Sequence, residues 1–600
     1  MTQYDVPVLI AGAGGAGLTA SMLLSDLGID SLAISSAPGT SVLPKAHVVQ
    51  QRSMEIYRRL GVADDIYTKG TPPENMARTG WYAGLQGDHE IYGREIAVQE
   101  SWGAGYTDPA WIAASPCRQT NLPQIRLEPV LLEHALKKNP GGVKFNQELI
   151  DFVQDDDGVT STIRDRETDE TYTVRSQYPL GADGGRMVGN HLGIEMQGER
   201  NILYSVSIHF TADLSQYMND DPSVLIRWMW PAHSGLLTLL VPMGPEKWGR
   251  DSEEWVFHLN YATEDKRVFD DEAMIADMKH ALGLPDFEPE IHKITRWTFE
   301  ALVAERFQEH RTFLLGDAAH RHGPTGGLGL NTAIQDADNL TWKIAQVLKG
   351  QASPALLNTY EPERQPVAAR NVRRSTENAM NHINIGAMLG VSPTQSEKEN
   401  IASLQRLWSD DPTDKEYKAR VRFAIASQSM EFSEHNVEFG YHYDSSAIVA
   451  IGEIPPPNPD EMRLYQPGTV PGSPVPHAWL DGPDGERKAI VDLLVPGEYL
   501  LLAGEDGAAW VAGAQQVASQ LNVPINAYTI GHVSGDLLDP RSAWVNQRGH
   551  GPAGVVLIRP DGFVAWRSQD LPAAGTTAEA LTGVLTQLSH RNADLTPATQ

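Results

Sequence analysis

The hydrophobic pattern at the start of the chain is a short apolar run that leads through glycines into a helical period. Val8–Ala11 is apolar at every position, which is typical of a buried parallel strand. Apolar residues then recur at helical spacing through Leu18–Leu27, and Gly28 can end that helix. A second apolar run follows at Ser31–Ile34. The pattern therefore predicts a β-α-β unit at the start of the chain.

The turn of this unit has the spacing G-x-G-x-x-G at Gly12, Gly14 and Gly17. The first glycine permits the bend, the second admits a pyrophosphate, and the third lets the helix pack against the strand. A plain glycine-rich turn is the alternative, but strand, turn and helix in one register favour a dinucleotide site. The acidic residue expected about 20 positions on is absent, since the second strand ends in hydroxyls. The expected cofactor contacts here are Gly12, Gly14, Gly15, Ala16, Gly17 and Ser35.

In the middle of the chain, the pattern changes from helical to alternating. Apolar and polar residues alternate from Leu203 to Thr211, as in a strand with one buried face. Such runs predict an antiparallel sheet, a layer distinct from the first unit. Residues 70–116 give no clear period. The other predicted elements of this middle part are helices at Ser53–Leu60, Glu128–Lys138 and Asp271–Leu282, and strands at Gly158–Ile163, Thr171–Val174, Leu180–Gly184, Val224–Trp230, Leu236–Val241, Trp255–Tyr261 and His292–Phe299.

The last part of the chain completes an α/β pattern. A buried-type strand at Phe313–Asp317 leads through a glycine-rich loop to a helix at Asn331–Leu348. Residues 355–450 indicate helices with charged faces, and Ile454–Pro459 indicates a linker. Beyond the linker, the order β-α-β and then hairpin predicts a compact domain from Ala489–Leu494, Tyr499–Ala503, Gly507–Leu521, Ala527–Ile530, Val555–Ile558 and Phe563–Arg567.

Composition narrows the partners. With 48 Lys and Arg against 77 Asp and Glu, the 600 residues carry a formal charge of -29, which disfavours nucleic acid and anionic membranes. Cys117 is the single cysteine, so no intrachain disulfide is possible and a cytoplasmic location is expected. No apolar run reaches about 18 residues, so neither a signal peptide nor a transmembrane helix is expected.

Several motifs, taken together, resemble the flavoprotein aromatic hydroxylases that bind FAD non-covalently. The most specific of these motifs is Gly316-Asp317-Ala318-Ala319-His320. The glycine turn and the segment Gly181–Gly184 are two others. The phenol hydroxylase branch, and within it the chlorophenol monooxygenases, is indicated by Pro44–His47, Gln51–Glu55, Leu122–Gln124, Leu127–Pro129 and Tyr443–Ser445. The resemblance covers nearly the whole chain, because these motifs occur in order and at fitting separations.

The resemblance implies an α/β fold with an interleaved arrangement. The expected parts are a Rossmann-like FAD-binding domain (1–195 and 301–360), an antiparallel-sheet substrate domain (196–300), a helical part (361–453), a linker (454–466) and a thioredoxin-like domain (467–600). This last domain contains no cysteine and can carry out no dithiol chemistry. A structural or dimer-contact role and a homo-oligomer are therefore expected.

The resemblance also implies the reaction. NAD(P)H would reduce FAD, reduced flavin would form a C4a-hydroperoxide with O2, and the ring of a small phenol would take the terminal oxygen. A larger polyketide-type phenol is one alternative. The other is an FAD-binding homologue without hydroxylase activity, which is favoured by Gly185–Val188, a segment that lacks the family's serine and is one residue shorter.

Further cofactor contacts follow from the matched motifs. An Asp at a strand end, such as Asp317, can accept hydrogen bonds from ribityl hydroxyls, with a turn cap as the alternative. The helix that begins near Asn331 points its N–H groups at the ring, where reduced flavin is negative. The expected contacts are Arg52, Gln124, Asp183, Gly184, Asp317, Gly327, Gly329, Leu330 and Asn331.

Two residues are candidates for the chemistry itself. His47 occupies the position where relatives carry an acidic residue or His, and an imidazole suits removal of a phenolic proton. An exposed loop histidine is the equally weighted alternative. Pro324 matches the family proline whose carbonyl lies near the substrate oxygen. Trp228 or Trp230 is expected to line the ring pocket. His320 and His322 are expected to pack and form hydrogen bonds, and no metal is expected.

Overall fold

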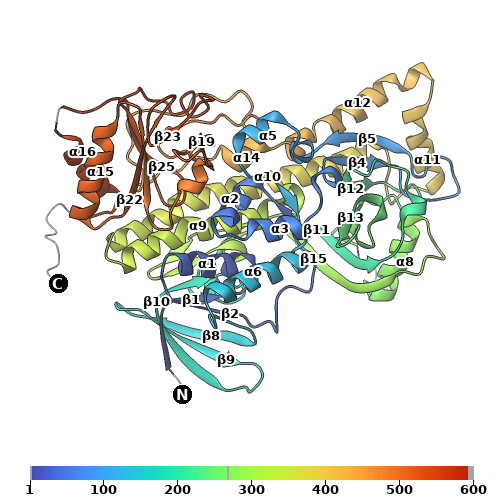
Figure 1. The fold of residues 1–600 in the computed structure, drawn as a ribbon. Coiled ribbons are helices and arrows are strands. Elements are labelled where there is room, and N and C mark those ends of the chain that lie inside the picture. Colours follow the sequence, from blue (N-terminus) through green and yellow to red (C-terminus); the bar gives the residue numbers. More distant parts are fainter. Residues whose placement is uncertain (1–2, 266–268, 574, 592–600) are drawn as a thin grey trace.

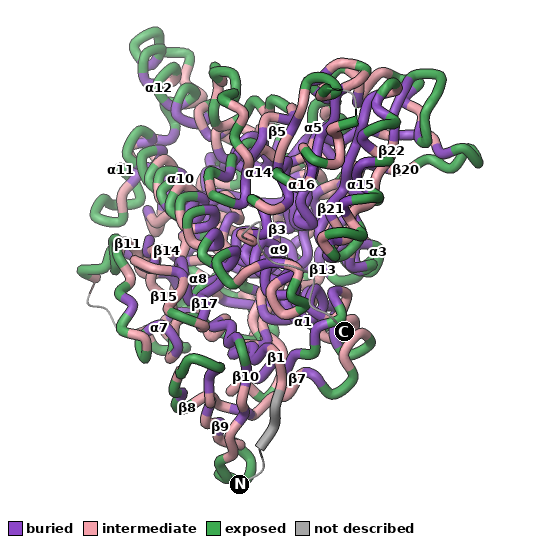
Figure 2. Tube along the Cα trace, turned by 90° about the vertical axis from the view of Figure 1, so that its left-hand side faces the viewer, coloured by how far each residue is buried: buried purple, intermediate pink, exposed green. Residues whose placement is uncertain are grey.

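The computed structural model describes residues 3–265, 269–573 and 575–591, which form a mixed α/β fold with three large sheets (Figure 1). The first sheet lies at the bottom of the view, the second at the right and the third at the upper left. The long helices α9 (Leu328–Leu348) and α10 (Tyr360–Leu389) run through the middle. Helix α9 is buried along most of its length, whereas α11 (Glu397–Gln405) and α12 (Lys415–Ala426) carry exposed faces (Figure 2).

The first sheet contains the predicted β-α-β unit. Its strand β1 (Gln3–Ala11) pairs in parallel with β2 (Ser31–Ile34) and β10 (Thr171–Gly181). Helix α1 (Gly15–Asp26) packs with α9 against this sheet. The other members are β7 (Val143–Lys144), β8 (Gln147–Gln154), β9 (Val159–Asp165), β16 (Gln308–Glu309) and β17 (Thr312–Leu314).

The second sheet is mainly antiparallel and has two apolar faces. One face packs on helix α8 (Asp271–Leu282), and the other faces α10. Its strand order is β18-β15-β11-β14-β13-β12-β4-β5. The strands are β4 (Arg78–Tyr82), β5 (Glu95–Glu100), β11 (Met196–Thr211), β12 (Val224–Met229), β13 (Thr238–Gly244), β14 (Glu254–Tyr261), β15 (Glu290–Ala304) and β18 (His320–Arg321).

Smaller elements connect these layers. The strands β3 (Val48–Val49) and β6 (Thr120–Asn121) form a short antiparallel pair. Along the chain, β3 follows β2 of the first sheet, and β6 follows the last of the strands that residues 78–100 add to the second sheet. The remaining helices before the linker are α2 (Gln51–Arg59), α3 (Ala63–Lys69), α4 (Trp102–Tyr106), α5 (Pro109–Ala114), α6 (Gln124–Lys138), α7 (Val188–His191), α11 (Glu397–Gln405), α12 (Lys415–Ala426), α13 (Ser429–Phe432) and α14 (His435–Phe439).

The third sheet belongs to the C-terminal domain and has the order β20-β19-β23-β22-β21-β24-β25. Helices α15 (Ala508–Leu521) and α16 (Thr577–Leu588) pack together beside it. Its strands are β19 (Trp479–Asp481), β20 (Arg487–Ala489), β21 (Tyr499–Gly504), β22 (Ile525–Gly531), β23 (Leu537–Leu538), β24 (Val555–Ile558) and β25 (Val564–Ser568).

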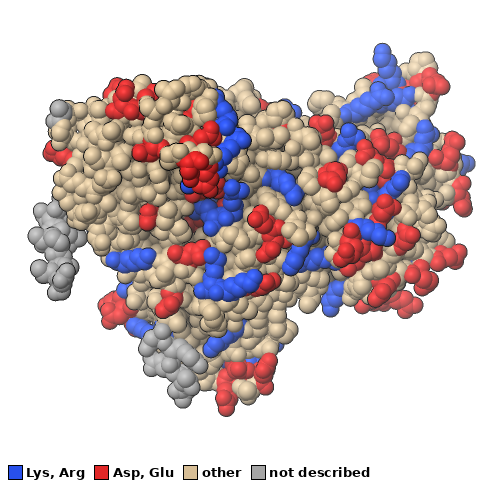
Figure 3. Space-filling model, viewed as in Figure 1, with Lys and Arg blue, Asp and Glu red and all other residues tan. Residues whose placement is uncertain are grey.

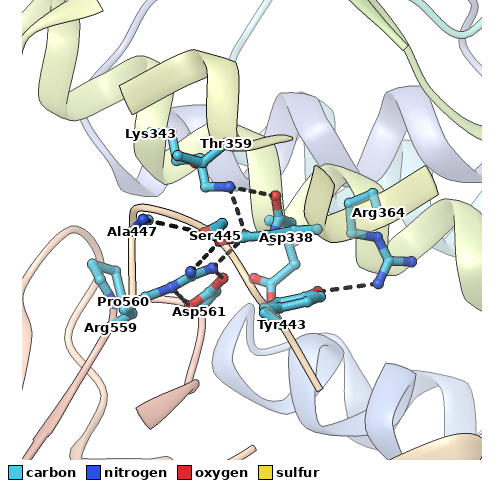
Figure 4. A network of polar contacts seen from close by, with 12 residues as sticks. Asp338, Lys343, Thr359, Arg364, Tyr443, Ser445, Ala447, Arg559, Pro560 and Asp561 are labelled. Atoms are coloured by element: carbon cyan, nitrogen blue, oxygen red, sulfur yellow. Dashed lines mark hydrogen bonds and ion pairs between the residues drawn. The ribbon is translucent and has the colours of Figure 1, made fainter. Parts of the chain in front are cut away.

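A buried cluster of charges joins the C-terminal domain to α9 and α10 (Figure 4). The guanidinium of Arg559 donates two hydrogen bonds to Glu363, at 2.6 and 2.9 Å, and also binds Asp561. Glu363 accepts a further bond of 2.7 Å from Lys343 and one of 2.6 Å from Ser445. These partners hold the pKa of Glu363 well below its usual range despite burial. The two parts of the chain therefore meet through ion pairs that water does not reach.

Some predicted elements were wrong in detail. The run at Ala489–Leu494 is a strand only up to Ala489, because the Asp492 carboxylate accepts the N–H of Ala489 and closes a turn. Leu180–Gly184 is no separate strand, since β10 continues beside β1 as far as Gly181. The second sheet extends beyond the predicted segment 196–300, because β4, β5 and β18 join its edges.

Charges of both signs are interspersed on the face in Figure 3. Among the described residues, no helix has the length and apolarity needed to span a bilayer.

Candidate active site

The glycine turn after β1 has the geometry of a phosphate-binding turn. Gly12 has a φ of +125°, and a Cβ there would lie 2.0 Å from the carbonyl oxygen of Ala182. A Cβ on Gly17 would lie 1.8 Å from the carbonyl oxygen of Gly12, so the close packing of α1 on β1 requires glycine. Helix α1 begins without a side-chain cap, which leaves its first N–H groups for an anion.

Two further expected contacts lie around this turn. The backbone N–H of Gln124 binds the carbonyl oxygens of Pro44 and Ala46, and its amide donates to Glu128 at 2.5 Å. The Ser35 hydroxyl accepts the N–H of Ala37 at 3.2 Å, just beyond β2. Both residues therefore shape the loops beside the glycine turn.

The turn after β17 presents an acidic side chain. Asp317 is exposed, and no hydrogen bond to its carboxylate is found among the described residues, so the alternative of a turn cap finds no support. Behind it, Asp336 accepts bonds from Gly316 N–H at 3.1 Å and from the Arg364 guanidinium at 2.8 Å, and binds His320 Nε2 at 2.6 Å. This buried cluster fixes the turn and leaves the Asp317 carboxylate available.

The start of α9 lies against both the glycine turn and the His47 segment. A Cβ on Gly15 would meet the Leu330 side chain at 2.7 Å, and one on Gly327 would meet Val48 at 3.1 Å. The Asn331 amide donates to the carbonyl oxygens of Val48 and Gly327 and accepts the N–H of Gln50. The Asn331 side chain thus joins the helix start to β3. Gly329 has His322 as its nearest neighbour, at 3.6 Å from an added Cβ.

His47 is held in a defined orientation. Its Nδ1 lies 2.5 Å from Oδ1 of Asn121, whose amide nitrogen donates to the Thr71 hydroxyl at 2.7 Å. Because the Thr71 contact places Oδ1 toward the imidazole, Nδ1 carries the proton and Nε2 holds a lone pair. Burial lowers the pKa of His47 below its ordinary value of 6.5, although the Asn121 bond opposes the shift. The half-buried His47 is therefore a neutral base at pH 7, and the alternative of an exposed loop histidine does not describe it.

The second sheet supplies an aromatic wall. Trp228 stacks on the His382 ring of α10, with centroids 3.5 Å apart and planes 8° apart. Trp230 lies on the same face, where a Cβ on Gly386 would meet its indole. Both tryptophans thus line this face. Val48 packs against it as well, so the segment after His47 approaches the sheet.

A carboxylate connects this wall to the glycine-rich loop. Glu431 binds His382 Nε2 at 2.8 Å and accepts the N–H of Gly326 at 3.0 Å. Pro324, two residues before Gly326, is exposed, and its carbonyl accepts the Gly327 N–H at 3.2 Å. His382 and Glu431 carry no signal in the sequence, because they lie on helices whose pattern shows no catalytic motif.

The side chains of Arg52 and Asp183 form hydrogen bonds with other groups of the protein. The buried Arg52 guanidinium donates to Glu55 at 2.9 Å and to the Asp561 carbonyl at 2.6 Å. The Asp183 carboxylate accepts three backbone N–H groups of the segment that follows it, at 2.7 to 3.0 Å. The exposed Gly184 has a φ of +72°. Cofactor contacts of Arg52, Asp183 and Gly184 stay predictions.

One cluster with metal-ligand chemistry lies apart from these turns. Ligand atoms of His209, Glu254 and His292 lie within 4.8 Å of one another. Arg126 already donates to the same Glu254 oxygen that His209 binds, which opposes a cation there. We therefore interpret His209, Glu254 and His292 as a hydrogen-bonded cluster on the second sheet.

These features fit FAD. The uncapped start of α1 suits the pyrophosphate, the exposed Asp317 carboxylate suits ribityl hydroxyls, and the glycines before α9 leave room for a flat ring. The glycine turn after β1 and the start of α9 are brought together by the contact between Gly15 and Leu330, which are 315 residues apart in the chain.

Comparisons with known proteins agree. Residues 5–375 match the family described as FAD binding domain, and residues 468–588 match the family described as aromatic-ring hydroxylase, C-terminal. A 2,4-dichlorophenol 6-monooxygenase of Delftia acidovorans is 34% identical over 94% of this chain and 95% of its own. A phenol 2-monooxygenase of Pseudomonas sp. (strain EST1001) is 33% identical over 96% of this chain and 91% of its own.

Solved structures give the same result. The flavin-dependent monooxygenase PieE, solved in complex with FAD and substrate, superimposes with a TM-score of 0.90. The two sequences are 36% identical, and the match covers 98% of this chain and 99% of PieE. The chain therefore belongs to the FAD-binding aromatic-ring hydroxylases.

Proposed function

We propose that this protein hydroxylates a phenolic ring with O2 and NAD(P)H, using non-covalently bound FAD. The observation that supports a phenolic substrate is the state of His47. It is a neutral base, and its contacts with Asn121 and Thr71 leave Nε2 as the unprotonated nitrogen. FAD, when bound, supplies hydride acceptance and oxygen activation. The side chains supply binding, orientation and proton transfer.

The chain's own part in binding FAD divides between its turns. The N–H groups at the start of α1 would hold the pyrophosphate, and Asp317 would hold the ribityl chain. The start of α9, whose macrodipole is positive there, would stabilise negative charge on the ring. Asn331 acts indirectly, because its amide is engaged with backbone atoms of Val48, Gln50 and Gly327.

His47 would prepare the substrate. Its Nε2 accepts the phenolic proton, so the ring becomes an electron-rich phenolate, and Asn121 stabilises the imidazolium that forms. The apolar face with Trp228 and Val48 would keep water from the reacting atoms, because reactive species would otherwise be hydrolysed. The Pro324 carbonyl would lie near the substrate oxygen, as the family resemblance implies.

Two finer assignments belong to the same proposal. The parallel pair β21 and β22, with β24 and β25 antiparallel beside it, supports a thioredoxin-like C-terminal domain. A homo-oligomer is supported by apolar side chains exposed on neighbouring helices, namely Met380, Ile383 and Met388 of α10 and Phe423 of α12.

The test uses the purified yellow protein. Acid precipitation should release all the colour into the supernatant, because the attachment is non-covalent. NAD(P)H oxidation should then rise on addition of phenols from a panel that runs from simple chlorophenols to fused-ring phenols. A flavin-loaded protein that no phenol stimulates would support the alternative of an inactive homologue, for which the Gly185–Val188 segment is the motivating feature.

A further inference from the structure

A second histidine faces the same site from the sheet. In antiparallel pairs, residues directly opposite each other point to one face. Trp228 is opposite Leu239, Leu239 is opposite His258, and His258 is opposite Ser207. Trp228 lies on the face that packs with Val48 and His382. His258 therefore shares the face that the segment after His47 approaches.

The tautomer of His258 follows from its neighbours. The indole Nε1–H of Trp297 donates to the Ser207 hydroxyl oxygen at 2.9 Å, and that oxygen also lies 2.9 Å from Nδ1 of His258. Among the described residues, Nδ1 is the one acceptor within reach of the Ser207 hydroxyl proton. The hydroxyl therefore donates to Nδ1, which leaves the proton of the neutral imidazole on Nε2.

The two histidines are complementary. His47 presents a lone pair on Nε2, and His258 presents an N–H on its own Nε2. Burial, together with the charge that His47 carries when it is protonated, lowers the pKa of His258 to about 4, so His258 is neutral at pH 7. It then adds no positive charge that would oppose protonation of His47.

We infer that His258 and His47 together bind the phenolic oxygen, with His258 donating a hydrogen bond to the oxygen from which His47 takes the proton. The O–H bond of the phenol breaks, its proton moves to Nε2 of His47, and the electron pair stays on the oxygen. His258 exchanges no proton and holds the phenolate through its Nε2–H. Ser207 is a positioning residue, since it acts through the imidazole. The inference rests on the proposed function.

The experiment measures the ionisation of bound phenol without turnover. FAD-loaded protein is titrated with 4-nitrophenol, and in parallel with 2,4-dichlorophenol, at several pH values, and the phenolate is followed by difference absorbance. Wild type should lower the pKa of the bound phenol relative to the free phenol. His258→Leu should bind phenolate roughly 10- to 100-fold more weakly, the range for a lost hydrogen bond to a charged group.

Two variants separate contact from folding. His258→Gln keeps a donor near the Nε2 position and should restore most of the binding. Ser207→Ala should shift the apparent pKa of the bound phenol in the same direction as His258→Leu, but by less. His292→Leu, at an exposed histidine of β15, is the matched control and should behave as wild type.

Each outcome decides between the claims. Equal phenolate binding by wild type and His258→Leu would overturn the inference while leaving the proposed function intact. Wild type that binds neither phenol, and whose NAD(P)H oxidation no phenol stimulates, would overturn both. FAD absorbance of each variant shows whether the fold survives.

Discussion

At the scale of the residue, the chemistry depends on which imidazole nitrogen carries the proton. The sequence placed His47 in a motif, and its type suggested a base. Only the structure reveals Asn121 and Thr71 beside it, because these residues come from β6 and from the segment after α3, 74 and 24 positions away. Sequence patterns report local periods and motifs, whereas such a hydrogen-bond chain depends on tertiary contacts.

Removal of His47 should separate flavin reduction from oxygen transfer. His47→Ala should keep its FAD but lose on the order of 10²–10⁴ in product formation, because the phenol is no longer deprotonated. NAD(P)H oxidation would continue and hydrogen peroxide would rise. The loss should shrink for phenols already ionised at the assay pH. Full coupling at the wild-type rate with a weakly acidic phenol would remove His47 from the mechanism.

The pH profile should report the same group. Because burial lowers the pKa of His47 from 6.5, the base form persists into mildly acidic solution, and rate is lost only as pH falls through this lower value. The acid limb of kcat/KM for a weakly acidic phenol should therefore lie below pH 6.5. An acid limb clearly above pH 6.5 would contradict the assignment.

Glu438 makes a separate prediction about stability. It is buried, accepts the Arg52 N–H and the Gln119 amide at 2.8 Å each, and burial raises its pKa to about 8. The folded state then binds the proton more tightly than the unfolded state, so stability is lost as pH rises between about 4.5 and 8. Glu438→Gln should flatten this part of the profile of Tm against pH. Parallel profiles for both proteins would show that Glu438 is ionised in the fold.

At the scale of the element, local patterns were informative where one segment decides its own structure. The β1-turn-α1 unit was predicted because its glycines and periods lie within about 20 residues. Strands β4 and β5 were missed, because Trp81 and its neighbours are defined by partners such as Trp228, far along the chain. The start of α9 extends three residues before the predicted Asn331, since glycines there are poor helix signals.

The tight contact of α1 on β1 gives a test of the cofactor turn. In Gly17→Ala, the added methyl would lie 1.8 Å from the Gly12 carbonyl oxygen, so α1 must move away from the phosphate position. We expect FAD content to fall sharply in the purified protein. Gly468→Ala, where a Cβ meets nothing within 4 Å, is the matched control and should keep its flavin. Normal FAD content in Gly17→Ala would argue against this turn as the phosphate site.

At the scale of the whole molecule, buried ion pairs hold the C-terminal domain in place. Arg559→Met would leave the fully buried Glu363 without its main partner, at a cost of about 3–5 kcal/mol in the free energy of unfolding. Arg541→Met is the control, because its pair with Asp481 is partly exposed and contributes about 1 kcal/mol or less. Denaturant unfolding of the two variants gives the comparison. Equal midpoints would mean that the buried cluster adds nothing beyond a surface pair.

Truncation tests the scaffold role that the absence of cysteine suggested. A chain that ends before Pro467 exposes Glu363 and the rings of Tyr441 and Tyr443, which pack against Phe563. Reduced solubility or altered assembly is the expected result, measured by size-exclusion chromatography. A truncated protein that stays soluble, keeps its assembly and loses only hydroxylation would instead give the domain a direct part in the reaction.

The contact between Arg52 and the Asp561 carbonyl has a consequence for protein engineering. Arg52 lies in α2, five residues after His47, and its guanidinium ends on the C-terminal domain. A chimaera that takes this domain from a relative would exchange one side of that contact, and any mismatch would act on α2 and on the His47 segment before it. The C-terminal domain is therefore not a freely interchangeable module: grafting it should change coupling and substrate choice, because Asp561 contacts the helix that follows the His47 segment.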